Sequence, residues 1–348
     1  MQDQFRLALL GAGMITQGSH LPAALESHRI KVAAIIDPAP DRARRLAASY
    51  GIDPIISERV DDVFGRVDGA LIATPNGSHR ELAVRCLDAG ISTLIEKPIA
   101  VSVEEGNAIC DAATRAGRVA AVGYSTRFRE STILLKELLD SGYFGRVTRF
   151  AHQFGTPGGW APLSAYNLKR ISSGGGVLMV TATHFLDRML HFWGAPHDVE
   201  YEDDSEGGPE ANCIARFAYR SGEHAFSGVA VYSKTCSLPG GMVIETERGQ
   251  VKLADSDDAQ IAFVPNDRPG IEQIIRRASG PLHDPTISVF RLQLEDFVMA
   301  CVDGVKPMVD AKEGTESMQL IERLYGARKP MRADWRGTSN GQSRAVPQ

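Results

Sequence analysis

Short apolar runs alternate with amphipathic segments along the first third of the chain. Apolar runs of four or five residues favour buried strands, and segments in which Ala and Leu recur among charged residues favour helices. Strands and helices that alternate in this way predict a parallel, doubly wound sheet of the Rossmann type. The predicted strands are residues 7–10, 32–36, 69–73, 92–95 and 119–122, and the predicted helices are residues 40–50, 78–89 and 102–116.

The pattern changes after about residue 123. Short segments of alternating apolar and polar residues, separated by turn residues, predict an antiparallel sheet. The acidic run at 200–206 is expected to be a solvated loop, and the polar segment 336–348 is expected to be disordered. Further predicted strands are residues 147–153, 212–219 and 224–232, and further predicted helices are residues 131–139, 176–192, 289–302 and 314–327.

The length of 348 residues exceeds what one hydrophobic core ordinarily organises, so two domains are expected, at 1–123 and 124–335. A net charge of −5, without any basic block, argues against nucleic acid and anionic membranes as partners. The sequence has no run of 18 apolar residues and no signal-like segment, so a cytoplasmic protein is expected. The five cysteines are scattered without CxxC spacing, which argues against a disulfide framework and a zinc cluster.

The first apolar run leads directly into a Gly-Ala-Gly turn and a helix-forming stretch. Gly11 permits a tight turn from strand to helix, and Gly13 lets the backbone approach a pyrophosphate at the N-terminus of the next helix. Met14 and Ile15, which open that helix, belong to the predicted cofactor site. Thr16 stands where the dinucleotide fingerprint has its third glycine.

Asp37 follows the next apolar run, 24 residues after Gly13. A carboxylate at this place can accept hydrogen bonds from both hydroxyls of an adenosine ribose, and it repels a 2′-phosphate. The sequence therefore predicts NAD as the cofactor in preference to NADP. Arg42 is the nearest residue that could reverse this preference.

The triplet Glu96-Lys97-Pro98 follows the predicted strand at 92–95, at the edge where open α/β sheets bind their ligands. Further motifs are Ala73-Thr74-Pro75-Asn76 with His79, Gly123-Tyr124 with Arg127-Phe128, Gly174-Gly175-Gly176 before His184 and Asp187, Asp296-Phe297, and Pro307-Met308-Val309-Asp310. Together these motifs, which extend over roughly residues 5–330, resemble the glucose–fructose oxidoreductase, inositol dehydrogenase and MocA family.

The resemblance implies a fold, an assembly and a cofactor site. The second domain is expected to be an α/β domain with a large open, mainly antiparallel sheet, through which a homodimer or homotetramer forms. A sugar or cyclitol is expected to bind between the two domains. The cofactor site is expected to include Thr74, Pro75, Asn76, His79, Glu96 and Lys97.

Lys97 and His184 are the two candidates for the base that alcohol oxidation requires, because the hydroxyl proton leaves as hydride moves to nicotinamide. His184 titrates near neutrality, and Lys97 would stabilise an alkoxide, or share the proton if burial lowers its pKa. The resemblance implies that both are catalytic and that the Lys97–Pro98 bond is cis. Val180 stands where inositol dehydrogenases carry an aspartate, so Lys97 is expected to take more of the proton transfer.

Other residues near these motifs allow more than one interpretation. A ring such as Trp160 can stack on a sugar, and Arg127 can meet a phosphate, but packing and surface roles stay open for both. A metal site on the helix that carries His184 is conceivable, but no further ligand is apparent and none is predicted. The predicted substrate contacts are Tyr124, Arg127, Trp160, Tyr166, Thr181, Thr183 and His184.

Three functions remain open at this point. The leading one is an NAD(P)-dependent dehydrogenase or ketoreductase that acts on a secondary hydroxyl or ketone of a sugar, cyclitol or nucleotide-linked sugar. In the alternative, tightly bound NAD oxidises a ring carbon only transiently, for glycoside cleavage, elimination or epimerisation. The third is a dinucleotide-binding regulator, against which the presence of both Lys97 and His184 argues.

Overall fold

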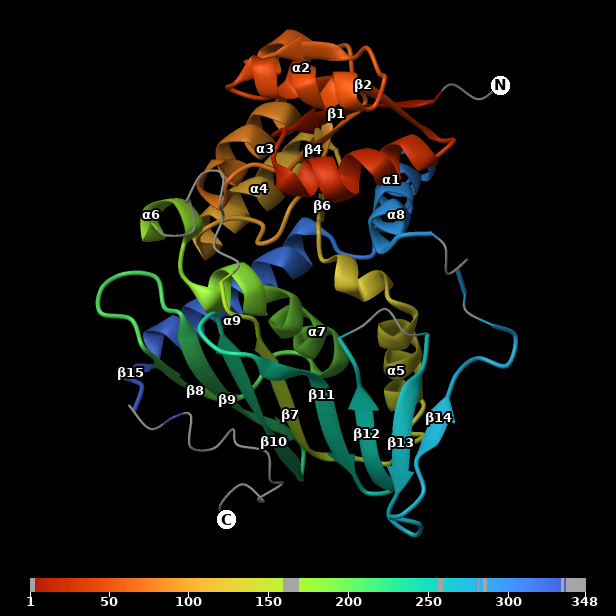
Figure 1. Cartoon of the computed structure of the whole chain (residues 1–348), viewed down its shortest axis with the longest axis vertical. Coiled ribbons are helices and arrows are strands. Elements are labelled where there is room, and N and C mark those ends of the chain that lie inside the picture. Colours follow the sequence, from red (N-terminus) through yellow and green to blue (C-terminus); the bar gives the residue numbers. More distant parts are fainter. Residues whose placement is uncertain are drawn as a thin grey trace.

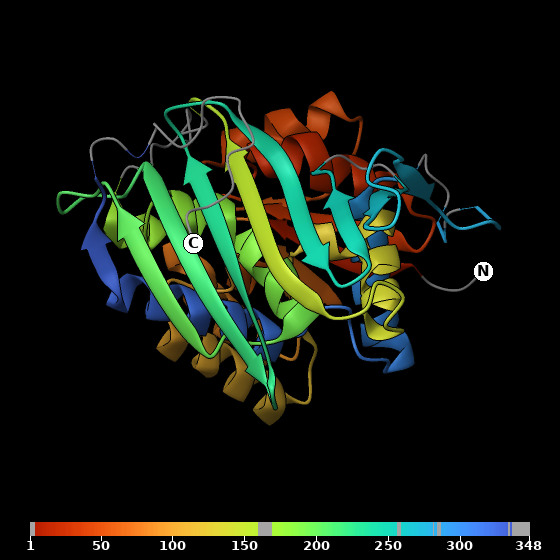
Figure 2. The same cartoon turned by 90° about the horizontal axis from the view of Figure 1, so that it is seen from below.

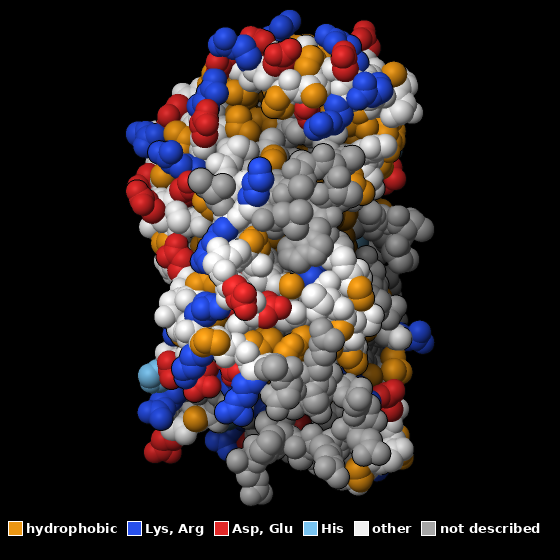
Figure 3. Space-filling model, turned by 60° about the vertical axis from the view of Figure 1, so that its left-hand side comes forward, with side chains coloured by type: hydrophobic (Ala, Val, Ile, Leu, Met, Phe, Trp, Pro, Cys, Tyr) orange, Lys and Arg blue, Asp and Glu red, His pale blue; other side chains and the backbone are white. Residues whose placement is uncertain are grey.

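A computed structural model describes residues 4–158, 169–255, 259–280, 282–283, 287–332 and 335. The chain forms two sheets that lie one above the other along the long axis of the molecule (Figure 1). No helix within these described ranges is long and apolar enough to cross a membrane. Figure 3 shows basic and acidic side chains interspersed over the described surface of the face that it draws.

The first sheet has six parallel strands in the order β3-β2-β1-β4-β5-β6, which confirms the predicted doubly wound sheet. The chain order reverses between β1 and β4, and ligands of such sheets bind at the carboxyl ends of the strands at that point. Of the six strands, β3 was not predicted. The elements are β1 (Phe5–Leu10), β2 (Ile30–Ile36), β3 (Ile55–Ser57), β4 (Gly69–Ile72), β5 (Ser92–Ile95) and β6 (Ala120–Val122), with α1 (Leu21–Glu26), α2 (Pro40–Ser49), α3 (His79–Asp88) and α4 (Val103–Ala116).

The second sheet has nine strands in the order β14-β13-β12-β11-β7-β10-β9-β8-β15, and it is mainly antiparallel as predicted. Only the pairs β7–β10 and β8–β15 are parallel among its described strands. The strands are β7 (Val147–Gly155), β8 (Asp198–Asp203), β9 (Asn212–Ser221), β10 (His224–Ser233), β11 (Leu238–Thr246), β12 (Gly249–Leu253), β13 (Ile261–Pro265), β14 (Gln273–Ile275) and β15 (Arg328–Pro330).

Helices cover one face of this second sheet (Figures 1 and 2). Phe217 and Tyr219 of β9 are buried on the covered face, whereas Arg216 and Arg220 alternate with them on the exposed face. The period of two explains why this strand was visible in the sequence. The remaining helices of the molecule are α5 (Glu130–Asp140), α6 (Arg170–Ser173), α7 (Thr183–Trp193), α8 (Val289–Asp303) and α9 (Ala311–Gly326).

The prediction of a solvated loop at residues 200–206 is wrong for its first half. Strand β8 runs through Asp203, and Tyr201 within it is fully buried. Asp203 is also buried, because its Oδ1 accepts a hydrogen bond from Nε of Arg328 at 2.6 Å. A partner 125 residues away therefore neutralises a carboxylate that the sequence alone shows as a solvated charge.

Two C-terminal helices connect the parts of the molecule. Helix α8 packs on the first sheet, where Phe297 meets the ring of Phe5 edge-on at 5.9 Å between centroids. Helix α9 begins beside β6, because the backbone N–H of Val122 donates to the carbonyl of Val309 at 3.0 Å. The predicted first domain, residues 1–123, is thus completed by helices from the far end of the chain.

Candidate active site

The glycine turn after β1 presents an uncovered helix N-terminus. Gly11 has a φ of +97°, and a Cβ added to it would lie 2.5 Å from the carbonyl oxygen of Ala73. A Cβ on Gly13 would meet no atom within 4 Å, so the backbone there is open to a ligand. Met14 and Ile15 follow with exposed side chains. These residues fit a pyrophosphate, which would accept hydrogen bonds from the free N–H groups of the helix.

Thr16 replaces the third glycine without disturbing the turn. Its side chain is fully buried, and its Oγ1 donates to the carbonyl of Gly11 at 2.6 Å. The chain continues as a π-helical turn, Thr16–His20, before α1. The hydroxyl thus closes the turn from the inside and leaves the outer side to the cofactor.

Asp37 is fixed beside this turn at the end of β2. Its Oδ2 accepts the backbone N–H of Ala12, and its Oδ1 accepts that of Ala39, both at 2.8 Å. Nη1 of Arg42 lies 3.5 Å from Oδ2. Oδ1 accepts the hydrogen bond from Ala39 and can accept a second, so a ribose hydroxyl can still bind there.

The segment from the end of β4 to the start of α3 contains four members of the predicted cofactor site, of which Thr74 is partly exposed and Pro75 exposed. Thr74 and Pro75 lie at the open edge of the sheet, whereas Asn76 and His79 are buried. Nδ2 of Asn76 donates to the carbonyl of Ser173 at 2.9 Å. The ring nitrogens of His79 each lie 2.9 Å from a carbonyl oxygen, of Thr74 and of Pro98, so His79 joins the loops after β4 and β5.

The loop after β5 holds a carboxylate and an amine side by side. Oε1 of Glu96 accepts from Nε2 of His20 at 2.7 Å, and Oε2 accepts the backbone N–H of Lys97 at 3.1 Å. Burial alone would raise the pKa of Glu96, but the hydrogen bond from His20 and the charge of Lys97 outweigh it and lower the pKa. The Lys97–Pro98 bond is cis, as predicted.

Lys97 reaches from this loop to the helix that carries His184. Its Nζ donates to the carbonyl oxygen of Val180 at 2.9 Å. Burial lowers the pKa of Lys97, while the charge of Glu96 partly opposes the shift. A backbone carbonyl therefore meets the lysine at the position where the sequence offers no carboxylate.

The glycine run before His184 packs so closely against its neighbours that it has no room for side chains. A Cβ on Gly176 would lie 2.0 Å from the carbonyl oxygen of Glu210. The Glu210 carboxylate is buried and accepts the backbone N–H groups of Gly176 and Leu178, each at 2.9 Å. The chain then forms the π-helical turn Leu178–Ala182 and continues as α7. Insertions of this type are frequent at functional sites.

His184 lies in the first turn of α7, next to two buried residues whose hydroxyls contact each other, Tyr124 and Thr183. The hydroxyl oxygens of Tyr124 and Thr183 are 2.8 Å apart, and the Tyr124 ring meets the His184 ring edge-on. Burial, followed by the charge of Lys97, holds the pKa of His184 well below its ordinary value of 6.5. The ring is therefore neutral at pH 7. Thr181 is partly exposed on the preceding turn.

Arg127 does not lie at an open surface. Its Nε and Nη2 both donate to the carboxylate of Asp187 at 2.8 Å, and its Nη1 donates to Nδ1 of His191 at 2.9 Å. This buried arginine fills the helix face on which a metal site was conceivable, and the described residues contain no group of metal ligands. Contact with a substrate would require the ion pair to open. Trp160 and Tyr166 lie outside the described residues, as does the segment 336–348.

Comparison with known families identifies the chain. Residues 5–124 match the model of an oxidoreductase family with an NAD-binding Rossmann fold, and residues 132–250 match the GFO/IDH/MocA C-terminal domain. The chain belongs to the GFO/IDH/MocA oxidoreductase family. The resemblance that the motifs indicated is confirmed, and so are the Rossmann domain and NAD as its cofactor.

Relatives within the GFO/IDH/MocA family include sugar dehydrogenases. The chain is 28% identical over 196 residues to the D-glucoside 3-dehydrogenase of Escherichia coli (strain K12), across 55% of this chain and 54% of that protein. It is 32% identical over 196 residues to the rhizopine catabolism protein MocA of Rhizobium meliloti, across 55% of this chain and 58% of that protein. The chain thus spans about half the length of the curated relatives that it matches.

A solved structure shows the same fold over nearly the whole chain. The aldose-aldose oxidoreductase from Caulobacter crescentus, complexed with glycerol, superposes with a TM-score of 0.82 at 23% identity. The superposition covers 93% of this chain and 97% of that chain. At this level of identity the likeness concerns the fold alone.

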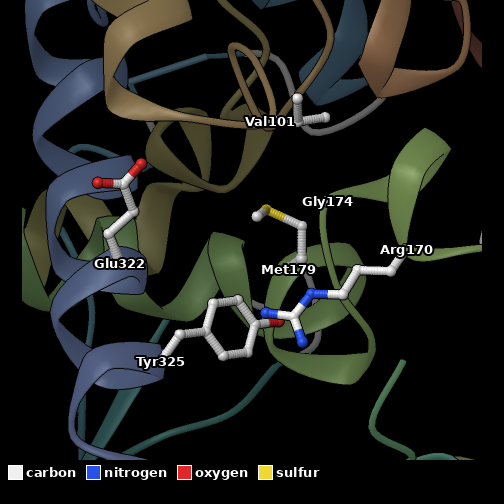
Figure 4. A pocket seen from close by; sticks show the side chains of 6 residues that line it. All are labelled: Val101, Arg170, Gly174, Met179, Glu322 and Tyr325. Atoms are coloured by element: carbon white, nitrogen blue, oxygen red, sulfur yellow. The ribbon is translucent and has the colours of Figure 1, made fainter. Parts of the chain in front are cut away.

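A separate hollow of about 390 Å³ lies behind the glycine run of this GFO/IDH/MocA protein (Figure 4). Arg170 extends its guanidinium over the ring of Tyr325, 5.2 Å from the centroid. Neither Lys97 nor His184 lines it, so the hollow is distinct from the candidate active site. Its lining residues are Val101, Arg170, Gly174, Met179, Glu322 and Tyr325.

Two residues that shape the candidate active site were missed in the sequence. His20 and Glu210 each act on a partner that is distant in the chain, 76 residues away for Glu96 and 34 for Gly176. Neither stands in a motif. A sign existed for Glu210 only in the glycine run, since three consecutive glycines indicate a place where another backbone approaches closely.

Proposed function

We propose that this protein is an NAD-dependent dehydrogenase or ketoreductase, which transfers hydride between nicotinamide and a secondary hydroxyl or ketone of a sugar, cyclitol or nucleotide-linked sugar. The observation that carries the proposal is the position of the partly buried amine of Lys97, which donates to the Val180 carbonyl at 2.9 Å. Val180 lies about one helical turn before His184. The similarity to a D-glucoside 3-dehydrogenase supports a sugar as the substrate and favours net hydride transfer over transient oxidation.

Bound NAD supplies the acceptor for the hydride in the direction of oxidation. Gly11, Gly13 and Asp37 would hold its pyrophosphate and ribose. The glycine turn and the Glu96-Lys97 loop both lie at the carboxyl edge of the first sheet, and Lys97 extends to the second domain. A sugar between the two domains would therefore meet both the cofactor and the amine.

Lys97 acts in this proposal as the base for the hydroxyl proton. An amine accepts a proton only in its neutral form, and burial lowers the pKa of Lys97 toward the working pH. The Val180 carbonyl orients the amine, because it accepts a hydrogen bond from Nζ of Lys97. In the direction of reduction the same nitrogen returns the proton to the carbonyl oxygen of the ketone.

His184 assists as a neutral hydrogen-bonding partner of the reacting oxygen. Its lowered pKa keeps the ring uncharged at pH 7, and its Nδ1 has no hydrogen-bond partner among the described residues. The neutral imidazole can donate at one nitrogen and accept at the other. Thr181 lies three residues before His184 and is partly exposed. Its hydroxyl can therefore contact a hydroxyl of a substrate bound at His184.

The test is absorbance near ~340 nm, which reports conversion of the cofactor directly. Purified protein is mixed with NAD or NADP and with cyclitols, free sugars, glycosides and nucleotide sugars. Lys97→Met is expected to lower kcat about 10²–10⁴-fold with the best substrate, while NAD binding is retained. Lys31→Met, which changes an exposed lysine of β2, serves as the matched control.

Two outcomes would contradict the proposal. One is turnover by Lys97→Met at the rate of the unchanged protein. The other is silence across the whole panel although NAD binds, in which case a retained cofactor that is reduced only transiently becomes the better account. The ratio of kcat/KM for NAD and NADP shows in the same assay whether Asp37 excludes the 2′-phosphate.

The assembly, the location in the cell and the division into domains stay predictions. The exposed face of the second sheet carries partly exposed apolar side chains, which supports a homodimer or homotetramer through this sheet. Examples are Ile214, Val229, Val231 and Val243. The cytoplasmic location and the domain limits, 1–123 and 124–335, rest on the sequence.

A further inference from the structure

His20 is buried between the two segments that form the cofactor edge of the first sheet. It ends the π-helical turn that follows the glycine turn, and its side chain has no exposed surface. Its Nε2 lies 2.7 Å from Oε1 of Glu96, so the imidazole N–H donates to the carboxylate. The ring edge packs on Phe290 of α8, at 5.1 Å between centroids.

Glu96 extends this contact to Lys97. Its second oxygen accepts the backbone N–H of Lys97, so the carboxylate is held at both oxygens. The negative charge is therefore fixed at the backbone N–H of Lys97, whose Nζ has a partner of its own in the Val180 carbonyl. Through space this charge raises the pKa of the Lys97 amine against the effect of burial.

The other titratable groups around this pair do not replace the carboxylate. His79 from α3 faces Glu96, whereas His184 from α7 and Lys234 from the end of β10 face Lys97. The positive charge of Lys97 lowers the pKa of His184 and of Lys234, because like charges repel. Neither group can therefore stabilise the protonated form of Lys97. Glu96 is the described neighbour whose charge favours protonation of Lys97.

We propose that His20 is a positioning residue, which keeps Glu96 ionised and aimed at Lys97. His20 belongs to the helical segment that follows the glycine turn. The protonation of Lys97 thereby depends on the position of that segment. The inference rests on the proposed function only for the role of Lys97 as the base. Its contacts are all within the protein, so it can be tested without a substrate.

Two substitutions separate hydrogen bonding from packing. His20→Phe keeps a ring against Phe290 but has no N–H for Glu96, whereas His20→Gln supplies an amide N–H and lacks the ring. Labelling of Lys97 by trinitrobenzenesulfonate is followed by peptide mass spectrometry as a function of pH, because only the neutral amine reacts. Lys97→Met identifies the labelled peptide.

The expected midpoint of labelling falls by about one pH unit in His20→Phe and stays unchanged in His20→Gln. The acid limb of kcat/KM for the best substrate is expected to move in the same way. Thermal melting and NADH binding show that each variant is folded. If His20→Phe does not fold, Glu96→Gln removes the carboxylate itself and should lower the midpoint by at least as much.

Three results would overturn the inference: coincident profiles of all proteins, equal shifts in both variants, or a shift in His20→Gln alone, which would assign His20 to packing. The inference is also overturned if the labelling midpoint of Lys97 does not shift in Glu96→Gln. Because labelling needs no turnover, the two proposals can fail separately. A labelling shift without turnover of any sugar would retain the role of His20 and contradict the proposed function.

Discussion

Gly11 and Gly13 stand in one turn, but they are required for different reasons. Gly11 adopts a left-handed φ of +97°, and any side chain there would press on the backbone of Ala73. Gly13 has no such neighbour, and only a bound cofactor would meet a side chain at that place. The fold therefore requires glycine at position 11, whereas only a bound cofactor requires it at position 13.

This difference predicts opposite effects of two alanine substitutions. Gly11→Ala should lower the free energy of unfolding by at least about 1–2 kcal/mol, because an L-residue is strained in this conformation. Gly13→Ala should leave stability unchanged and weaken NAD binding. Chemical denaturation and titration with NADH measure the two quantities. Equal loss of stability in both variants would contradict the assignment.

At the scale of elements, the π-helical turn before α7 determines how Lys97 and His184 are placed relative to each other. The turn brings the Val180 carbonyl to Lys97, and α7 continues it to His184. Its start is fixed by Glu210, whose carboxylate accepts two backbone N–H groups of this segment. The spacing between Lys97 and His184 thus depends on how closely Gly176 approaches Glu210.

Gly176→Ala is expected to displace this segment. The added Cβ would fall 2.0 Å from a backbone oxygen, which cannot rotate away as a side chain can. We expect lower stability and a larger relative loss in kcat than in NAD binding, because the glycine turn of the first domain is untouched. Kinetics and thermal melting measure both effects. Gly326→Ala is the matched control, since a Cβ there meets nothing within 4 Å.

The sequence was sufficient for elements with a period and for motifs with short spacing. The alternation in β9 and the 24-residue interval between Gly13 and Asp37 are local, and the structure places both as expected. Contacts between distant segments were not visible, such as that of Glu96 with His20. Arg127 shows the same limit, because its charge suggested a ligand while Asp187 neutralises it.

At the scale of the whole molecule, buried imidazoles make the fold sensitive to acid. Burial lowers the pKa of His79, His152, His184 and His191, each of which is held in its neutral form. As pH falls below about 6.5, the unfolded chain takes up protons that the folded chain refuses. Stability should therefore decrease with falling pH until the folded histidines themselves are protonated.

His191 allows this expectation to be tested at one residue. Burial, with the charge of Arg127, lowers its pKa to about 4, so its contribution is lost between about pH 6.5 and pH 4. In His191→Gln the amide oxygen can still accept from Arg127, and no proton is taken up on unfolding. The decrease in unfolding free energy from pH 7 to pH 5 should be smaller by about 1–2 kcal/mol in this variant.

Denaturation with urea at a series of pH values measures the slope directly. His28→Gln, which changes an exposed histidine, should keep the slope of the unchanged protein. If His191→Gln and the unchanged protein lose stability in parallel, the proton on His191 does not contribute and the acid sensitivity belongs to other groups. A reduced slope in His191→Gln alone would show that the Arg127–His191 contact requires a neutral ring, because Nη1 of Arg127 donates to the lone pair of Nδ1, which a protonated ring does not have.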